Sequence, residues 1–230
     1  MIPTLTSAEL NALRSYTTTT VANAIESFNV RLRNEGYTNG TIRPVIPRTD
    51  VMLGHAVTMR LKSSNPPAQG HLYTDRTDLW NYVQTLPAPR IVVIQDGDDQ
   101  PGAGSFIGAT HANILMSLGC VGVITNGAAR DLPEIEKLAF HLYAGAVVPS
   151  HGFAHVFDFG KPVTVAGLKI SQGDLLHGDV NGVVSVPKEL GAEIPPAADA
   201  ILERESRILK MCRSKDFSIE RLCEIITQKP

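Results

Sequence analysis

Two short runs of β-branched residues, each followed by a stretch with helical spacing, constrain the fold more than any other feature. Arg90–Gln95 and Val121–Thr125 are apolar enough to be buried strands. Ile107–Leu118 and Asp131–Leu138, which follow them, carry apolar residues at helical intervals. Strands that alternate with helices of about ten residues are typical of an α/β fold with parallel pairing. We therefore predict an α/β fold whose parallel strands lie in the middle of the chain.

The segments on either side are predicted to complete one domain. Before the central strands we expect a strand at Val51–Leu61 and three helices, at Ser7–Tyr16 (with Ser7 as its N-cap), Val21–Phe28 and Thr74–Leu86. After them we expect short strands at Val147–Val148, Pro162–Val165, Leu168–Ile170 and Gly182–Val186, then helices at Lys188–Cys212 and Ser218–Thr227. Residues 1–230 are thus predicted to be a single domain. Its sandwich core is 1–187, and its C-terminal helices, 188–230, are expected to pack on the core or on a neighbouring subunit.

Composition argues against several classes of protein. The 21 Lys and Arg residues are matched by 23 Asp and Glu, for a net charge of -2, so no nucleic-acid partner is expected. No apolar run approaches the ~18 residues of a membrane span, and the N-terminus has no secretory pattern. The three cysteines show no metal or redox spacing, which favours a reducing compartment. We expect a cytoplasmic protein without a membrane partner.

Glycine is concentrated in one segment. Fourteen of the 19 glycines lie between Gly97 and Gly182, and glycine serves where the backbone needs positive φ or close approach. Gly102–Gly108 resembles a dinucleotide-binding loop, but the apolar strand ends too early, near Gln95, and the expected acidic residue is missing. Nucleotide binding is therefore the weaker interpretation, and we expect another kind of site in this segment.

Two histidines form a second candidate motif. His151 and His155 are four residues apart, and on a helix such a pair can share a metal ion. Pro149 and Gly152 argue against a regular helix at this point. We interpret the pair as surface or loop histidines.

The third candidate is the pair Arg130-Asp131, which stands between a buried strand with its glycine turn and a helix. Sites in α/β proteins lie at the carboxyl ends of parallel strands, so a cation and a carboxylate at this point suit a functional role. The alternative is a surface Arg beside an Asp that caps the following helix. The spacing alone leaves both interpretations open.

Several motifs then occur in an order that resembles one known superfamily. Gly119, Gly122 and Gly127 precede Arg130-Asp131, and the motifs that follow are Pro149, Gly160-x-Pro162-Val163, Gly173-Asp174 and Asp179-x-x-Gly182-Val183-Val184-x-Val186-Pro187. From about Gly102 to Pro187 the chain is similar to the superfamily of the regulator of ribonuclease activity A and the 4-hydroxy-4-methyl-2-oxoglutarate (4-carboxy-4-hydroxy-2-oxoadipate) aldolases. Weaker echoes occur at Thr20-Val21-x-x-Ala24 and Gly54-x-Ala56-Val57-Thr58.

The resemblance implies an α-β-β sandwich related to swivelling domains, with a C-terminal helical extension, assembled as homotrimers or homohexamers. In the aldolases the active site lies between subunits and uses Mg²⁺ or Mn²⁺. Carried over to this chain, Asp131 would bind the metal and Arg130 would hold a small 2-oxo acid. The start of the preceding helix would grip the substrate carboxylate through backbone groups of Gly108, Ala109, Thr110 and His111. A Glu from the C-terminal region of a neighbouring subunit is also implied, and Glu203 and Glu205 are the candidates.

The implied reaction is aldol cleavage of a 4-hydroxy-2-oxo acid, or decarboxylation of oxaloacetate, through a pyruvate enolate. A divalent ion and a fixed guanidinium would both stabilise that charge. Ala109 departs from the pattern, because the aldolases carry there an acidic residue that helps to hold the metal and its waters. His111 and Asn113 are the candidates to compensate, and His111 would do so as a catalytic neutral imidazole. The sequence predicts a metal-dependent lyase and leaves two alternatives: a non-catalytic regulator that binds a protein, or different chemistry on a related oxo or hydroxy acid.

Overall fold

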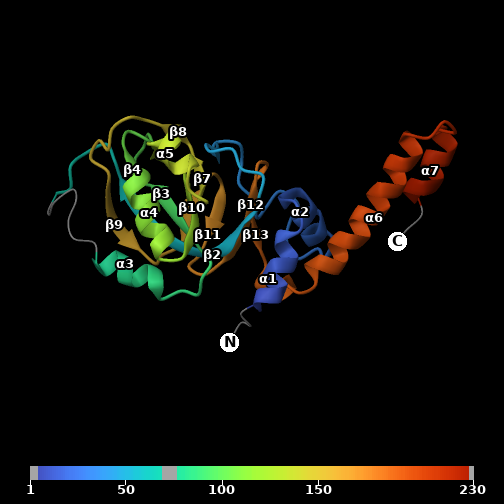
Figure 1. Cartoon of the computed structure of the whole chain (residues 1–230), viewed down its shortest axis with the longest axis horizontal. Helices are drawn as coiled ribbons and strands as arrows, with labels where there is room; N and C mark the ends of the chain where they lie inside the picture. The colour runs from blue at the N-terminus through green and yellow to red at the C-terminus, as the bar shows by residue number, and fades with distance from the viewer. Residues whose placement is uncertain (1–4, 69–76, 228–230) are drawn as a thin grey trace.

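A mixed eight-stranded sheet forms the centre of the protein in the computed structural model, which describes residues 5–68 and 77–227 (Figure 1). The strand order is β1-β7-β5-β3-β2-β12-β13, and β9 pairs with the second half of β2. The strands are β1 (Arg43–Pro44), β2 (Met52–Lys62), β3 (Arg90–Asp96), β5 (Cys120–Thr125), β7 (His141–Ala144), β9 (His155–Phe159), β12 (Leu175–Asp179) and β13 (Gly182–Val186).

The middle of this sheet is parallel, as the sequence predicts. The strands β2, β3, β5 and β7 run in one direction, with Val57 beside Val92 and Val92 beside Val123. The two β-branched runs become β3 and β5, and both are almost entirely buried. Because β2 is eleven residues long, its first half pairs with β12 and its second half with β9, both antiparallel.

The sheet carries helices on one face and a β-hairpin on the other. Val92 and Ile94 point to the face covered by α3 (Thr77–Gln84), α4 (Ala109–Ser117) and α5 (Leu132–Glu136). Ile91 and Val93 point to the opposite face and pack against β10 (Val163–Val165) and β11 (Leu168–Ile170). This alternation along one strand gives each face its own apolar core. The layers are those of an α-β-β sandwich, and the predicted fold class is confirmed.

A second, small parallel sheet continues from the carboxyl ends of the parallel strands in the main sheet. We call this side of the main sheet the carboxyl edge, and the side where those strands begin the amino edge. It consists of β4 (Ser105–Ile107), β6 (Ala128–Ala129) and β8 (Ala146–Val147), in the order β4-β6-β8. The three strands follow β3, β5 and β7 along the chain, so each parallel strand leads into one strand of the small sheet. Gly145 permits one of these links, since a Cβ there would come within 2.5 Å of the Asn126 carbonyl oxygen.

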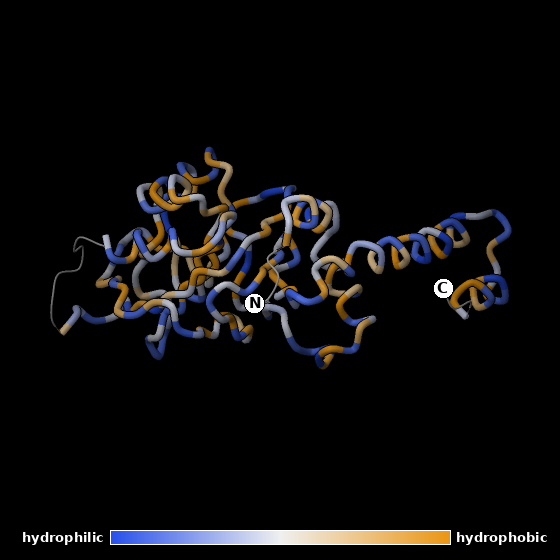
Figure 2. The backbone as a smooth tube through the Cα atoms, turned by 90° about the horizontal axis from the view of Figure 1, so that it is seen from below, coloured by the Kyte–Doolittle hydropathy of each residue, from blue (hydrophilic) through white to orange (hydrophobic). Residues whose placement is uncertain are grey.

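Helices from both ends of the chain pack together beside β12 and β13. Here α1 (Ser7–Arg14) and α2 (Thr18–Ser27) meet α6 (Ile194–Cys212), which follows a 3₁₀ turn, η1 (Lys188–Leu190). Ile194 and Ala198 are fully buried in this contact. Farther on, α6 leaves the body of the protein, and α7 (Ile219–Thr227) folds back along it (Figures 1 and 2). We call residues 202–227 the C-terminal arm.

Several predicted boundaries are wrong, for local reasons. Thr6, not Ser7, caps α1: its hydroxyl accepts from the Glu9 N–H, while the Glu9 carboxylate accepts from the Thr6 N–H. The helix predicted from Ile107 begins at Ala109, because residues 105–107 form β4. The helix predicted over 188–212 divides into η1 and α6, which has Pro195 and Pro196 in its first turn. The start of the helix predicted at 74–86 lies outside the described residues.

None of the helices in the described ranges is both long enough and apolar enough to span a bilayer.

Candidate functional site

The small sheet gathers three distant stretches of chain at one edge. Gly108 follows β4, Arg130 and Asp131 follow β6, and His151 follows β8. The Arg130 N–H donates to the Ile107 carbonyl oxygen at 3.0 Å, which fixes the second stretch against the first. The Ser105 N–H donates to the Ser150 carbonyl oxygen, also at 3.0 Å, which fixes the third. The candidate residues are therefore held by backbone hydrogen bonds at the ends of strands.

Asp131 faces the preceding helix and not its own. It adopts the left-handed conformation, with φ 56°, and its carboxylate makes no capping bond to α5. Instead its Oδ2 accepts from the Ala109 N–H at 3.1 Å, and lies 3.8 Å from Arg130 Nε. The interpretation of Asp131 as a side-chain cap of the following helix is therefore wrong.

Gly108 allows the Arg-Asp pair to lie against the start of α4. A Cβ at this position would come within 2.5 Å of Asp131 Oδ2 and 3.0 Å of Arg130 Nε. Any other residue would push both side chains away from the helix. The glycine is thus required by the site rather than by a turn, since its φ of -138° is open to all residues.

Arg130 has hydrogen-bonding capacity that the described residues do not meet. Its Nε is buried and has no hydrogen-bond partner among them, although its side chain is 25% exposed. A buried, unpaired donor on a charged group is costly, so native structures rarely retain one without a purpose. A planar acid that bridged the guanidinium would satisfy it.

The start of α4 offers further donors next to this guanidinium. The N-cap residue, Gly108, has no side chain to cap the helix, and the first intrahelical bond runs from the Ala112 N–H to the Gly108 carbonyl. The Ala109 N–H is taken by Asp131. The N–H groups of Thr110 and His111 have no acceptor within the helix, and the helix dipole favours an anion at this end.

The His111 ring lies among aromatic side chains and is held neutral. Its centroid is 4.4 Å from that of Phe106 and 6.1 Å from that of Trp80. Burial, with smaller contributions from His151 and Arg130, lowers the pKa of His111 to about 4. The pKa of His151 is also lowered, by burial and by Arg130, while Asp131 opposes the shift. At neutral pH the His111 imidazole therefore has a nitrogen that can accept a proton.

The donor atoms at this edge suit a metal ion that is shared with a substrate. No three His, Cys, Asp or Glu side chains within residues 5–68 and 77–227 form a metal-binding group, and Ala109 contributes none. Asp131 is the carboxylate in place, 37% exposed. Mg²⁺ is commonly held by one or two carboxylates, with water and substrate oxygens completing the octahedron. The residues present thus fit a single-carboxylate site. Glu203 and Glu205 lie on the arm, which extends away from α4 and α5 of the same chain (Figure 1).

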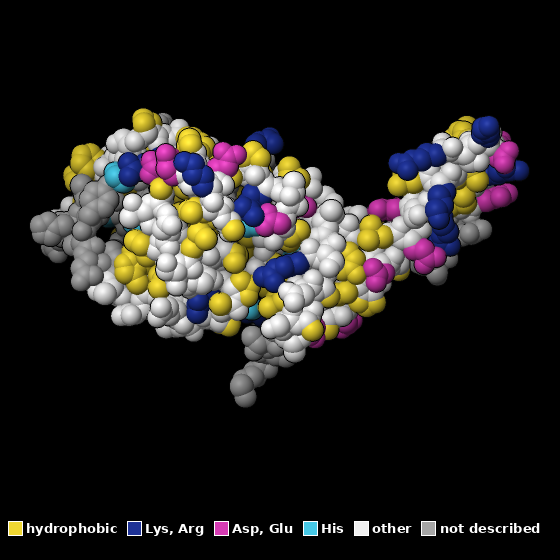
Figure 3. Space-filling view, in the orientation of Figure 1, with side chains coloured by type: hydrophobic (Ala, Val, Ile, Leu, Met, Phe, Trp, Pro, Cys, Tyr) yellow, Lys and Arg dark blue, Asp and Glu magenta, His cyan; other side chains and the backbone are white. Residues whose placement is uncertain are grey.

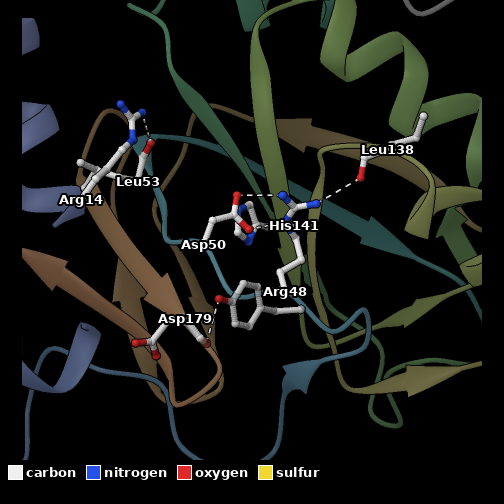
Figure 4. Close-up of polar contacts among 8 residues, drawn as sticks. Arg14, Arg48, Asp50, Leu53, Leu138, His141 and Asp179 are labelled. Atoms are coloured by element: carbon white, nitrogen blue, oxygen red, sulfur yellow. Dashed lines mark hydrogen bonds and ion pairs between the residues drawn. The ribbon is translucent and has the colours of Figure 1, made fainter. Parts of the chain in front are cut away.

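A hollow of about 870 Å³ lies at the opposite edge of the sheet, where β2, β5 and β7 begin. Arg48, Asp50 and His141 are grouped together in this hollow, and Arg14 points to the Leu53 carbonyl oxygen (Figure 4). Arg48 donates from Nε and Nη2 to the two oxygens of Asp50, at 2.7 and 2.8 Å, and His141 Nε2 is 3.5 Å from Asp50. The Asp179 carboxylate accepts from the N–H groups of Thr18 and Asn181. Asp179 belongs to a motif noted in the sequence, but nothing there linked it to the other members, which are spread over the chain from α1 onward.

The sequence was compared with protein families and with known proteins. A family described as RraA-like, Aldolase/RraA, matches residues 18–185. A relative from Halalkalibacterium halodurans, named "Putative 4-hydroxy-4-methyl-2-oxoglutarate aldolase", is 26% identical over 78% of this chain and 76% of its own length. An uncharacterized protein of Methanocaldococcus jannaschii is also 26% identical, over 76% of this chain and 80% of its own. The chain belongs to the RraA-like family.

Two solved structures share the fold. An uncharacterized protein from Pseudomonas syringae has a TM-score of 0.74 at 20% identity, over 97% of this chain and 96% of its own. Streptomyces coelicolor RraAS2, described as an unusual member of the RNase ES inhibitor RraA protein family, has a TM-score of 0.69 at 19% identity, over 89% and 96%. A sequence relative is thus named as a putative aldolase, and a protein that shares the fold is named within an inhibitor family.

Proposed function

We propose that this protein is a divalent-metal-dependent lyase that cleaves a C–C bond in a small 2-oxo acid. The observation that carries the proposal is the buried, unpaired Nε of Arg130, set by Gly108 beside Asp131 and the open start of α4. A cation, a carboxylate and free backbone donors within one small edge match a planar 2-oxo acid. The aldolase names among the relatives support the same choice.

Binding would use charge-assisted and backbone hydrogen bonds. The substrate carboxylate would accept from the Thr110 and His111 N–H groups at the start of α4, and the Arg130 guanidinium would bridge the carboxylate and keto oxygens. Asp131, held by the Ala109 N–H, would hold Mg²⁺ or Mn²⁺. When bound, that ion would act as a Lewis acid toward negative charge on the substrate oxygens.

The reaction needs a proton to leave and a proton to return. In aldol cleavage a base removes the proton of the 4-hydroxyl group, and the oxygen electron pair forms a C4 carbonyl as the C3–C4 bond breaks. The C4 fragment leaves as a carbonyl compound, and the electron pair of the broken bond forms the enolate of pyruvate. Protonation at C3 then gives pyruvate. The same enolate results when oxaloacetate loses CO₂. We assign the base role to the His111 imidazole, which belongs to the first turn of α4 and is unprotonated at pH 7; its lowered pKa makes it a weaker base than an ordinary imidazole.

Assembly is part of the proposal. The resemblance to the aldolases supports a homotrimer or homohexamer in which a neighbouring copy adds to the site, with residues 1–230 acting as one domain. One carboxylate at the edge agrees with a site that is completed from outside the chain.

Pyruvate release is the test. Purified protein is mixed with oxaloacetate and, separately, with 4-hydroxy-4-methyl-2-oxoglutarate, in the presence of Mg²⁺, Mn²⁺ or EDTA. Each rate is compared with a protein-free blank that contains the same acid and the same ion. We expect pyruvate to form faster than in the blank with a divalent ion, and no faster than in the blank with EDTA. Folded protein that gives no rate above the blank for either acid would refute the proposal.

One observation favours a second candidate, a non-catalytic regulator that binds a protein. Position 109 holds an alanine, so the start of α4 lacks a carboxylate that would help to hold a metal. A regulator would have no use for the unpaired Nε of Arg130, and for this reason we rank it second. Inhibition of a ribonuclease by the protein, with no turnover of either acid, would favour this candidate.

A further inference from the structure

Three rings from three different elements come together at the start of α4. The centroid of the His111 ring is 4.4 Å from that of Phe106, with 36° between the ring planes, and 6.1 Å from that of Trp80, with 48°. Phe106 belongs to β4 and Trp80 to α3, and both pack against the core between the helices and the sheet. We call Trp80, Phe106 and His111 the aromatic wall.

The aromatic wall is open to solvent and lies beside the candidate site. Each of its three residues is half-buried, whereas Phe140 in the core below is fully buried. In the space-filling view, hydrophobic side chains lie at the surface over α3 and α4 (Figure 3). Arg130 is close enough to His111 to contribute to the lowering of its pKa. A ligand held by Arg130 can therefore cover the exposed parts of these rings.

The proposed reaction determines which part of the substrate meets the aromatic wall. In that reaction the start of α4 and Arg130 hold the carboxylate and keto groups, and the His111 imidazole removes the proton of the 4-hydroxyl group. The hydroxyl oxygen must then come within about 3 Å of the imidazole. The other group on C4 consequently lies next to the neighbours of His111 in the wall, Phe106 and Trp80.

The wall favours an uncharged group at this place. Phe106 and Trp80 carry no charge, and burial keeps the His111 ring neutral at pH 7 by lowering its pKa. Ala109, in the first turn of α4, also packs against the apolar core. A carboxylate set against these side chains would lose water without gaining a cation, which is costly. An aryl group would instead pack on the rings, in the offset or tilted arrangements that aromatic pairs prefer.

We propose that the substrate is a 4-hydroxy-2-oxo acid with an aromatic group on C4, and that Trp80 and Phe106 select it over an acid with a second carboxylate there. This inference rests on the proposed function and narrows its substrate. With 4-hydroxy-2-oxo-4-phenylbutanoate, His111 takes the hydroxyl proton, the C3–C4 bond breaks, and C4 leaves as the carbonyl carbon of benzaldehyde. The electron pair of the broken bond forms the pyruvate enolate, which is protonated at C3.

Binding tests the selection without turnover. 2-Oxo-4-phenylbutanoate and 2-oxoglutarate both lack the 4-hydroxyl group, and they differ in the phenyl or carboxylate group on C4. Isothermal titration calorimetry with Mg²⁺ compares their affinities, and the fluorescence of Trp80, the only tryptophan of the chain, reports contact with the wall. We expect the phenyl acid to bind on the order of tenfold more tightly and to change the Trp80 emission. 2-Oxoglutarate should leave the emission unchanged.

Variants of the wall test the two selecting residues. Phe106→Ala removes one ring and should bring the two affinities to within about threefold of each other. Trp80→Leu removes the other ring, from a different element, and gives the same test by calorimetry if Phe106→Ala does not fold. Trp80→Phe keeps an aromatic ring and should retain the preference. Tyr37→Ala is the matched control, because Tyr37 is 47% exposed and lies beside Val184 of β13, outside the site.

Pyruvate release separates this inference from the proposed function. With a divalent ion, we expect kcat/KM to be about tenfold higher for 4-hydroxy-2-oxo-4-phenylbutanoate than for 4-hydroxy-4-methyl-2-oxoglutarate. Release from oxaloacetate or 4-hydroxy-4-methyl-2-oxoglutarate, with no preference for the phenyl acids in binding or turnover, would overturn the inference and leave the proposed function in place. No release from any of the three acids would overturn both. A preference that persists in both Phe106→Ala and Trp80→Leu would overturn the role of the wall.

Discussion

The two edges of the central sheet differ in what they leave unsatisfied. The carboxyl edge holds Arg130, whose buried Nε lies 3.8 Å from Asp131 Oδ2 but has no hydrogen-bond partner among the described residues. The amino edge has the hollow of about 870 Å³, but its Arg48, Asp50 and Asp179 are bonded to one another or to backbone groups. The volume of the hollow therefore points to the amino edge, whereas the unmet hydrogen-bonding capacity of Arg130 points to the carboxyl edge. Since an unpaired buried donor is costly and an open hollow filled with water is not, we place the function at the carboxyl edge.

We expect the largest difference in activity between the variants Arg130→Ala, at the carboxyl edge, and Arg14→Ala, at the amino edge. Arg130→Ala should lower kcat/KM for pyruvate release by about a thousandfold, in the range found when a charge-stabilising donor is lost. Arg130→Lys should recover little of it, because an ammonium group cannot make the bidentate contact. Arg14→Ala, at the wall of the hollow, should leave kcat/KM within about threefold. Steady-state kinetics of the three variants decide the matter, and a large loss in Arg14→Ala with none in Arg130→Ala would reverse the assignment.

The pH dependence of stability tests the environment of His111. The pKa of this residue is about 4 when folded and 6.5 in its ordinary state, so between these values the unfolded chain binds more protons. The free energy of unfolding should therefore fall as the pH falls through this range, with about 3 kcal/mol lost by pH 4 on account of His111. In His111→Phe this part should disappear, as measured by urea unfolding at several pH values. An unchanged pH slope in the variant would contradict the burial of the imidazole.

The variant Gly108→Ala tests whether Gly108 positions Arg130 and Asp131 at the carboxyl edge. The new Cβ would displace the end of the Asp131 side chain and the Arg130 guanidinium, both of which can move. We expect kcat/KM to fall by about tenfold with little change in stability, since a small misplacement at a site is costly to catalysis. Gly97→Ala is the matched control, because its Cβ would meet only the Leu61 carbonyl oxygen at 3.6 Å. Equal activities in the two variants would show that Gly108 does not position the pair.

Arg48→Ala probes the amino edge and has the smallest expected effect. It removes the bidentate bond to Asp50, which also holds the pKa of that carboxyl below its usual value, and the bond to the Leu138 carbonyl oxygen. Because Asp50 is 55% exposed, we expect a loss of about 1 kcal/mol in the free energy of unfolding. The measurement is urea unfolding alongside kinetics, and kcat/KM should be unchanged. A loss of activity without a loss of stability would place function at the hollow.

Sequence patterns predicted the parts of the fold whose signal is local. The β-branched runs became β3 and β5 within a residue of their predicted ends, because a buried strand needs only a continuous apolar stretch. The strand β12 was missed, because it contains His177 and Gly178, which do not suggest a strand. His177 is fully buried only because Thr18 Oγ1 and the Leu13 carbonyl, both far along the chain, lie within hydrogen-bonding distance of its ring. No local pattern carries that information.

The geometry of the candidate site, too, could be predicted only where it depends on neighbouring residues in the sequence. The positions of Arg130 and Asp131 between strand and helix were readable from the sequence. The direction of the Asp131 carboxylate was not, because it depends on the Ala109 N–H and on the missing side chain of Gly108, more than twenty residues earlier. The strands β4 and β6, of three and two residues, were not predicted, and β8 was predicted one residue late, at Val147–Val148; together the three strands bring these residues into one place.

Oxalate binding tests the central claim most directly, because oxalate has the planar, charged shape of the pyruvate enolate. Isothermal titration calorimetry compares the wild type, Arg130→Ala and Arg14→Ala, each with Mg²⁺. If the function lies at the carboxyl edge, oxalate binds the wild type and Arg14→Ala with similar affinity, and binding to Arg130→Ala is lost. Binding that survives in Arg130→Ala but is lost in Arg14→Ala would contradict the account.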